Sequence, residues 1–227
     1  DNNHLVVIKQ YKEINGEIIE QIAHQYGPFR HGILSSVIFH PAELEVILSA
    51  LCPLLILDEN TPLPVRNAYK TTGTLGKDRI AAAIGGHSIF PVTDLLVVVA
   101  GSCLTYDFIT AGGLYQGGAI SPGLTMRFRA LHTFTGKLPL IDHDGPDPLT
   151  GDTTETSIRS GVVHGMVAEI QGITERYIHQ YPDLKILFSG GDQPFLAGRL
   201  NFRTCAVPDI VMIGLQKILA FNVQQHS

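Results

Sequence analysis

The sequence has few cysteines, little charge and no long uninterrupted apolar segment. Its three cysteines, Cys52, Cys103 and Cys205, lie far apart in apolar surroundings. This pattern fits neither a disulfide framework nor a zinc knuckle, so we expect three core thiols. No apolar segment reaches the roughly 18 residues that a membrane-spanning helix needs, and no basic-then-apolar leader opens the chain. These absences predict a cytoplasmic protein that does not contact a membrane.

Basic residues are scattered along the chain. The formal net charge is −5, and no block of lysine and arginine provides the electrostatic footprint that nucleic-acid binding requires. We therefore expect no nucleic-acid partner. The 227 residues are 44% hydrophobic with a mean hydropathy of +0.17, which is ample material for one large domain or two small ones.

Runs rich in valine, isoleucine and leucine alternate with helical patterns, as in a layered α/β fold. The continuous run at residues 54–58 predicts a strand buried on both faces. The apolar spacing from Thr154 onward predicts a long helix with one buried face, and Gly85-Gly86 is expected to end a shorter helix. We expect strands at residues 4–11, 32–39, 54–58, 96–100, 103–108 and 184–189, and helices over 41–51, 77–86, from about 122, from 154 and over 208–222.

Two glycine-containing turns are candidates for contact with a charged ligand. Gly101-Ser102 separates two apolar strands, and so small a turn lets backbone N–H groups approach a phosphate closely. An ordinary β-hairpin has the same appearance. Gly190-Gly191 lies between a strand and a helix, where backbone can also lie against a ligand or simply form a turn.

The stretch "TLGKDRIAAAIGG" places an acid and a base in one helical turn. Asp78 and Arg79 are expected to project toward the same space, the carboxylate as a general base and the guanidinium as a fork for an anionic group. The alternative is that Asp78 only caps the helix. The acidic loop "DHDGPD" lacks the spacing of a calcium site, so we expect it to be solvated and assign no metal ligands there.

Four stretches together resemble the type III pantothenate kinases, from about residue 32 to the C-terminus. They are "NAYKTTGTLGKDRIAAAIG", "AGSCLTYDFITAGGLYQGGAISPGLTMRFRALHTFTGKLP", "GDTTETSIRSGVVHG" and "FSGGD" followed by "PDIVMIGLQKIL". The resemblance implies two similar ribonuclease-H-like α/β halves of the acetate-kinase/Hsp70/actin type, here residues 1–110 and 111–227, with ATP in the cleft between them. It also implies transfer of the ATP γ-phosphate to the primary hydroxyl of pantothenate, the first step of coenzyme A synthesis.

The resemblance also assigns roles to single residues. Asp78 matches the general base, and Gly101 and Ser102 match the second phosphate hairpin, where the family more often has threonine than serine. Thr154 is expected to reach pantothenate across a homodimer interface. The positions that match pantothenate-binding residues are Tyr69, Gly76, Lys77, Arg79 and Thr154.

The sequence departs from the family pattern in two places. The family's D-A-G-T hairpin has a potassium-ligating aspartate where this chain has Val99, and the D-x-G-N-T phosphate loop expected ahead of residue 1 has no match. The cofactors implied are ATP, Mg²⁺ and a monovalent cation, K⁺ or NH₄⁺. Val99 argues against the monovalent cation, because its side chain cannot coordinate one. A non-catalytic relative with an accessory role is the alternative. A sugar or acetate kinase that shares only the fold would make the "GKDR" and "GDTTETSIRSG" matches coincidental.

Overall fold

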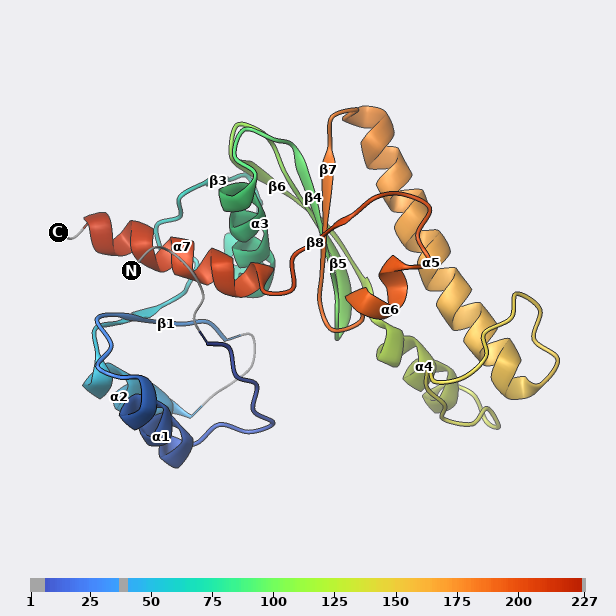
Figure 1. The fold of residues 1–227 in the computed structure, drawn as a ribbon, viewed down its shortest axis with the longest axis horizontal. Helices are drawn as coiled ribbons and strands as arrows, with labels where there is room; N and C mark the ends of the chain where they lie inside the picture. Colours follow the sequence, from blue (N-terminus) through green and yellow to red (C-terminus); the bar gives the residue numbers. More distant parts are fainter. Residues whose placement is uncertain (1–6, 37–40, 226–227) are drawn as a thin grey trace.

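The protein is described by a computed structural model that covers residues 7–36 and 41–225. Figure 1 shows a small N-terminal lobe beside a larger body built on a six-stranded sheet. The lobe contains α1 (Gly16–Tyr26), β1 (Gly32–Leu34), α2 (Ala42–Leu51) and β2 (Leu54–Ile56). The larger body contains β3 (Arg66–Asn67), α3 (Lys77–Ile89), β4 (Leu95–Ala100), β5 (Cys103–Ile109), β6 (Leu114–Pro122), α4 (Leu124–Thr133), α5 (Thr154–Gln180), β7 (Lys185–Ser189), α6 (Gln193–Ala197), β8 (Cys205–Ala206) and α7 (Ile210–Gln225). The α/β class predicted from the sequence is confirmed.

The N-terminal lobe is where the strand predictions fail. Residues 7–11 form no strand, and the rest of the strand predicted at 4–11 lies outside the described residues. The strand predicted at 32–39 is limited to Gly32–Leu34 in the described part. The prediction that residues 54–58 are buried on both faces is wrong, because Ile56 is 41% exposed and, among the described strands, β2 pairs only with β1. The helix expected to begin after Pro41 is confirmed as α2.

The larger sheet has the strand order β3-β6-β5-β4-β7-β8. β4, β5 and β6 form an antiparallel meander, and β7 continues the sheet parallel to β4. The pairing of β5 with β6 joins residues on both sides of the boundary predicted at 110/111. The division into two halves therefore stays a prediction.

Helices cover both faces of this sheet (Figure 1). Leu96, Val98 and Ala100 of β4 face a core shared with α4, α5 and α6. Leu95 and Val97 face a second core shared with α3 and α7. Because successive strand residues point to opposite faces, a strand between two helical layers has to be apolar at every position.

The glycines expected to end α3 lie in its interior, so that prediction is wrong. The helix continues through both glycines to Ile89. Gly85 lies where α3 packs against α7, and Gly86 lies where it packs against the sheet. A Cβ on Gly85 would overlap the carbonyl oxygen of Ile210 on α7, and one on Gly214 would overlap that of Ala81. These positions let the backbones of α3 and α7 approach closely, which fixes α3 on the sheet.

The long helix predicted from Thr154 is confirmed as α5. A capping box between Thr153 and Thr156 begins it. Of the predicted apolar face, Ile158, Val162, Met166 and Ile170 are buried, and Ile173 and Tyr177 pack against the same core. Thr154 itself is exposed at the start of the helix.

The prediction that the cysteines are core thiols is wrong. Cys205 is exposed and the other two are only partly buried. Cys205 lies on the two-residue edge strand β8, Cys103 follows the hairpin turn and Cys52 ends α2, so each lies at the margin of an element. Within the described residues, no helix is both long and apolar enough to span a lipid bilayer.

Candidate functional site

The Gly101-Ser102 turn joins β4 to β5 as a tight hairpin, as predicted. Val99 pairs with Thr105 and Ala100 with Leu104, and the Gly101 N–H donates to the Cys103 carbonyl oxygen at 2.9 Å. A Cβ on Gly101 would meet no atom within 4 Å, and Ser102 is exposed. Packing among the described residues therefore does not require glycine at this position.

The second glycine turn lies directly against the first. Gly190 has φ +99°, and a Cβ on it would overlap the Ala100 carbonyl, so only glycine fits there. The Asp192 N–H donates to that carbonyl oxygen at 3.0 Å. A Cβ on Gly191, like one on Gly101, would meet nothing within 4 Å. The fold thus brings the two predicted turns together at the ends of β4 and β7, each with an open glycine.

Asp192 ties this pair of turns to α4, and sequence reasoning missed it. Its carboxylate accepts the backbone N–H of Leu124 in the first turn of α4. Burial raises the pKa of Asp192, while His143 and the Leu124 N–H oppose the rise. A carboxylate directly after a glycine pair was the available signal.

The first turn of α3 separates the two charges that were expected to point together. Arg79 is only 5% exposed, whereas Asp78 is exposed to solvent. The prediction that they project toward the same space is wrong, because successive helical residues point about 100° apart. Oδ1 of Asp78 accepts the Arg79 N–H at 2.9 Å. A Cβ on Gly76 would lie 2.7 Å from that oxygen, so glycine is needed beside it.

Arg79 is paired with a residue that the sequence did not reveal, Asp107 on β5. Oδ1 of Asp107 accepts from Arg79 Nε at 3.0 Å, lies 2.8 Å from Nη2, and accepts from the Tyr115 hydroxyl at 2.7 Å. Burial raises the pKa of Asp107, and Arg79 and Tyr115 only partly oppose the rise. Burial lowers the pKa of Arg79, but Asp107 more than offsets this and leaves it above its usual value. The available signal was a lone carboxylate in the apolar strand "CLTYDFI".

Tyr69 lies beside this pair. Its ring centroid is 5.8 Å from Arg79 Cζ and 6.3 Å from the Tyr115 ring. Gly117, at φ +96°, leaves room for it, since a Cβ there would approach the Tyr69 ring to 2.9 Å. The structure therefore groups Tyr69 with the predicted positions at 76–79.

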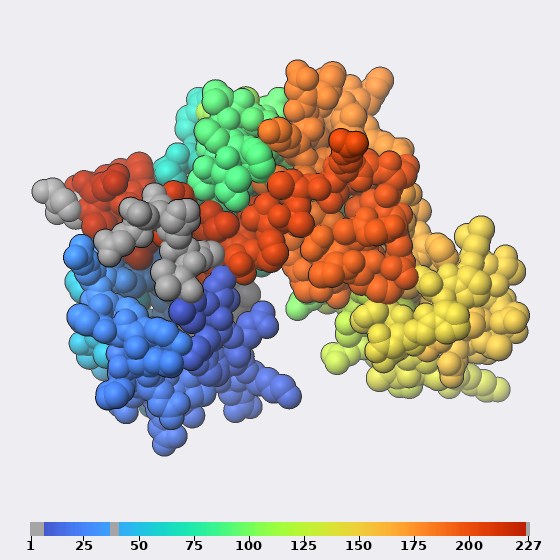
Figure 2. All heavy atoms as spheres, in the orientation of Figure 1, coloured from blue at the N-terminus to red at the C-terminus, as the bar shows by residue number. Residues whose placement is uncertain are grey.

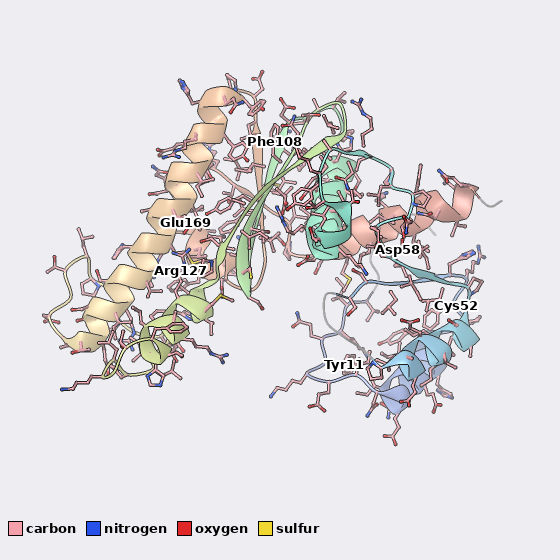
Figure 3. All side chains as sticks on the ribbon, turned by 180° about the vertical axis from the view of Figure 1, so that it is seen from behind. Tyr11, Cys52, Asp58, Phe108, Arg127 and Glu169 are labelled. Atoms are coloured by element: carbon pink, nitrogen blue, oxygen red, sulfur yellow. The ribbon has the colours of Figure 1, made fainter. Side chains whose placement is uncertain are left out.

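A cavity lies where the loop after β2 meets α3. Its polar lining includes Asp58, Glu59, Asn67, Thr72 and Lys77. A hydrogen bond from Thr61 lowers the pKa of Asp58, and the Lys77 ammonium acts in the same direction. Figure 3 shows Asp58 at the junction between the N-terminal lobe and α3. Lys77 thus faces the lobe, away from the Asp107 pair.

The orientation of α3 relates these residues to the glycine turns. Arg79, near its start, reaches Asp107 on β5, whereas His87, near its end, contacts Gly113 beyond that strand. The first turn of α3 is therefore the end nearer the β4–β5 hairpin. Figure 2 shows a broad recess between the N-terminal lobe and the part of the larger body around α4. Thr154 is not brought to this group, because α5 lies on the opposite face of the sheet from α3 (Figure 1).

The residues around Val99 do not suit a cation. Its in-register neighbours Thr105 and Ser189 carry hydroxyls, but Ser189 Oγ donates to the Pro208 carbonyl at 3.0 Å. The carboxylate on the same face of β5, Asp107, is paired with Arg79. Nor do the described residues contain a group of three or more His, Cys, Asp or Glu side chains that could hold a metal ion. We derive no catalytic step through a metal ion from this chain.

Comparison with known proteins identifies the family. The family model described as type III pantothenate kinase matches residues 8–176. The chain belongs to the type III pantothenate kinase family. Two curated type III pantothenate kinases agree. The protein from Bacteroides fragilis is 42% identical, and the match covers 90% of this chain and 84% of that protein. The protein from Phocaeicola vulgatus is 39% identical, and the match covers 98% of this chain and 92% of that protein. The α/β fold class that the resemblance implied agrees with this membership.

A solved structure shares the fold of this pantothenate kinase family member. It is described as a conserved putative Baf family transcriptional activator from Campylobacter jejuni, with a TM-score of 0.62 and 22% identity, and the match covers 91% of this chain and 89% of that one. At this identity the likeness concerns the fold alone. Nothing in the comparisons supports the non-catalytic alternative.

Proposed function

We propose that this chain transfers the γ-phosphoryl group of ATP to the primary hydroxyl of pantothenate. The observation that carries the proposal is the placement of an exposed carboxylate, Asp78, on the end of α3 that lies nearer to the two adjoining glycine turns. Relatives about 40% identical over most of the chain are named type III pantothenate kinases. Phosphoryl transfer needs positioning and charge neutralisation more than covalent chemistry, and such a site provides both.

In this proposal Asp78 is the general base. One of its oxygens, Oδ1, accepts the Arg79 N–H, which fixes the plane of the carboxylate. The other oxygen, Oδ2, takes the proton of the pantothenate hydroxyl as the hydroxyl oxygen bonds to the γ-phosphorus, and the bond from that phosphorus to the bridging oxygen breaks to release ADP.

The two glycine turns are the proposed ATP-binding elements. The backbone N–H groups around Gly101 and Gly191 approach the phosphates where a side chain would block them, and the Ser102 hydroxyl donates a further hydrogen bond. A divalent metal ion bound with ATP would neutralise phosphate charge. The monovalent cation is left out of the proposal because of the surroundings of Val99.

We place pantothenate against the first turn of α3 and the ring of Tyr69. Thr154 then belongs to the site of a second copy, because within one chain it lies across the sheet. Large apolar side chains are exposed near α4 and the start of α5, among them Phe134 at 85% and Leu149 at 79%. Such a surface favours association, so a homodimer is part of the proposal. The cytoplasmic location stays a prediction.

The test is phosphorylation of radiolabelled pantothenate by the purified chain, compared with its Asp78→Asn variant. We expect the variant to lower kcat about 10²- to 10⁴-fold, the range for loss of a general base, while calorimetry shows pantothenate binding largely intact. Asp144→Asn, at an exposed acidic position outside the site, is the matched control and should retain activity. Equal loss of binding and turnover would make Asp78 a structural cap, and a wild-type chain that binds ATP without turnover would overturn the proposal.

A further inference from the structure

The Arg79–Asp107 pair is an unusual core element. Asp107 is 0% and Arg79 5% exposed, although the residues that follow Arg79 on α3 and bury against the same face are apolar. Within the described residues, Oδ2 of Asp107 and Nη2 of Arg79 have no well-aligned hydrogen-bond partner. Burying two charges costs several kcal/mol each, so such a pair is often no more stable than apolar residues of similar volume. Stability alone does not explain this pair.

The Arg79–Asp107 pair determines the direction of Asp78 through helix geometry. With Arg79 held against the sheet, the 100° step between residues directs Asp78 away from it. The Arg79 N–H donates to Asp78 Oδ1, and Gly76 is packed against both: its Cβ would lie 2.7 Å from Asp78 Oδ1 and 3.4 Å from Arg79 Cγ and Cδ. A rotation of this turn about the helix axis would therefore move Asp78 directly.

The same pair also supports Tyr69. The guanidinium lies 5.8 Å from the Tyr69 ring centroid, and the ring lies over Gly117 on the neighbouring strand. The base and the aromatic wall of the pantothenate site thus both depend on where Arg79 is held.

We propose that Asp107 is a positioning residue of the pantothenate site, which anchors Arg79 and thereby fixes the direction of Asp78. The inference rests on the proposed function and changes the part that Arg79 plays in it. Arg79 is then an internal support of the turn, whereas in the sequence prediction it is a fork that binds an anionic substrate group.

The first measurement compares Asp107→Asn with wild type in steady-state kinetics. A base misplaced by about 1 Å costs up to about a hundredfold in rate, so we expect kcat to fall about ten- to a hundredfold with little change in KM for pantothenate. Asp107→Glu, which keeps the charge, should recover part of this loss. Tyr106→Phe is the matched control: Tyr106 is the adjacent β5 residue, and the variant loses a partly buried hydrogen bond to Glu169 on the opposite face of the sheet.

A change in KM for pantothenate in either direction, with kcat unchanged, would overturn the proposal in favour of Arg79 as a substrate fork. Unchanged kinetics in a folded Asp107→Asn would overturn it in favour of simple packing. If Asp107→Asn does not fold, the double variant Arg79→Met/Asp107→Leu replaces the pair by apolar residues. We expect it to keep the wild-type melting temperature and still lose kcat, and full activity in it would again contradict positioning.

Hydrogen exchange separates this inference from the proposed function, since it needs no turnover. In Asp107→Asn the amides of Arg79 and Ile80, which both donate to the Gly76 carbonyl oxygen, should exchange about tenfold faster than in wild type, while Tyr106→Phe leaves them unchanged. Unchanged exchange at these amides would overturn the positioning role even if the chain is an active kinase. Faster exchange in a chain without turnover would support the positioning role and reject only the kinase assignment.

Discussion

The close approach of α3 and α7 gives a stability prediction of definite sign. Gly214→Ala would place a methyl group on the Ala81 carbonyl, so the two helices would have to separate. The same substitution at Gly165, on α5, meets no atom within 4 Å. One chemical change is thus compared at a crowded helical position and at an open one.

The magnitude follows from two opposing contributions. Alanine is favoured over glycine in a helix interior by about 1 kcal/mol. Overpacking a well-packed core costs about 1–3 kcal/mol, and the obstacle here is backbone, which yields least, so the upper end applies. Gly214→Ala should therefore lower the free energy of unfolding by about 2 kcal/mol, or about 4–8 °C in Tm for a chain of this length. Gly165→Ala should instead raise it by about 1 kcal/mol.

Thermal and urea unfolding followed by circular dichroism measures both variants under one set of conditions. A Gly214→Ala variant as stable as wild type would show that the α3–α7 contact adjusts freely. Equal stabilisation of both variants would mean that helix propensity alone governs these positions, and the account of α3 as a helix fixed by its glycines would be wrong.

Three further predictions concern the site and its surroundings. Val99→Asp adds a carboxylate beside Thr105. Replacing Na⁺ by K⁺ at constant ionic strength should then raise the variant's phosphorylation rate and its Tm. Equal rates and equal Tm in the two salts would reject Val99 as the missing ligand position. Gly101→Val points into open space, so Tm should stay the same while KM for ATP rises about tenfold, and a large loss of Tm would show that the glycine is structural. Burial lowers the pKa of His87, whose Nδ1 has no hydrogen-bond partner among the described residues, so folding disfavours its protonation and stability should fall as the pH drops below about 6.5. His87→Gln should lose less unfolding free energy between pH 7.5 and 5.5, and parallel pH curves would contradict this.

Sequence patterns predicted the larger body well because its elements carry complete signals. β4 is apolar over its whole length, β5 is largely apolar, a glycine turn joins them, and α5 has a regular buried face with a capped start. Such signals are local and need no knowledge of distant partners. The N-terminal lobe lacks them: residues 7–11 include Val7, Ile8 and Tyr11, yet no neighbouring strand in the described residues pairs with them.

The glycines show where a local interpretation has to fail. Gly85-Gly86 has the sequence of a helix end, and only the path of α7, more than a hundred residues later, makes it an interior contact. Conversely, Gly101 and Gly190 were predicted separately as turns, and sequence gave no indication that one lies against the other. Long-range packing decides both cases, and a single sequence without its partners does not contain that information.

The charged residues of α3 show that long-range packing also decides which residues can contact a substrate. Asp78 and Arg79 are adjacent in sequence, so a shared ligand is the simplest interpretation, but helix geometry assigns one to solvent and the other to the core. What decides between them is Asp107, which lies 28 residues further along the chain and to which the sequence analysis assigned no role. A buried arginine with a dedicated carboxylate binds its own protein before it can bind a substrate. The anionic end of pantothenate would have to compete with Asp107 for Arg79, so a substrate fork predicts a changed KM for pantothenate in Asp107→Asn, whereas positioning predicts a loss of kcat with little change in KM.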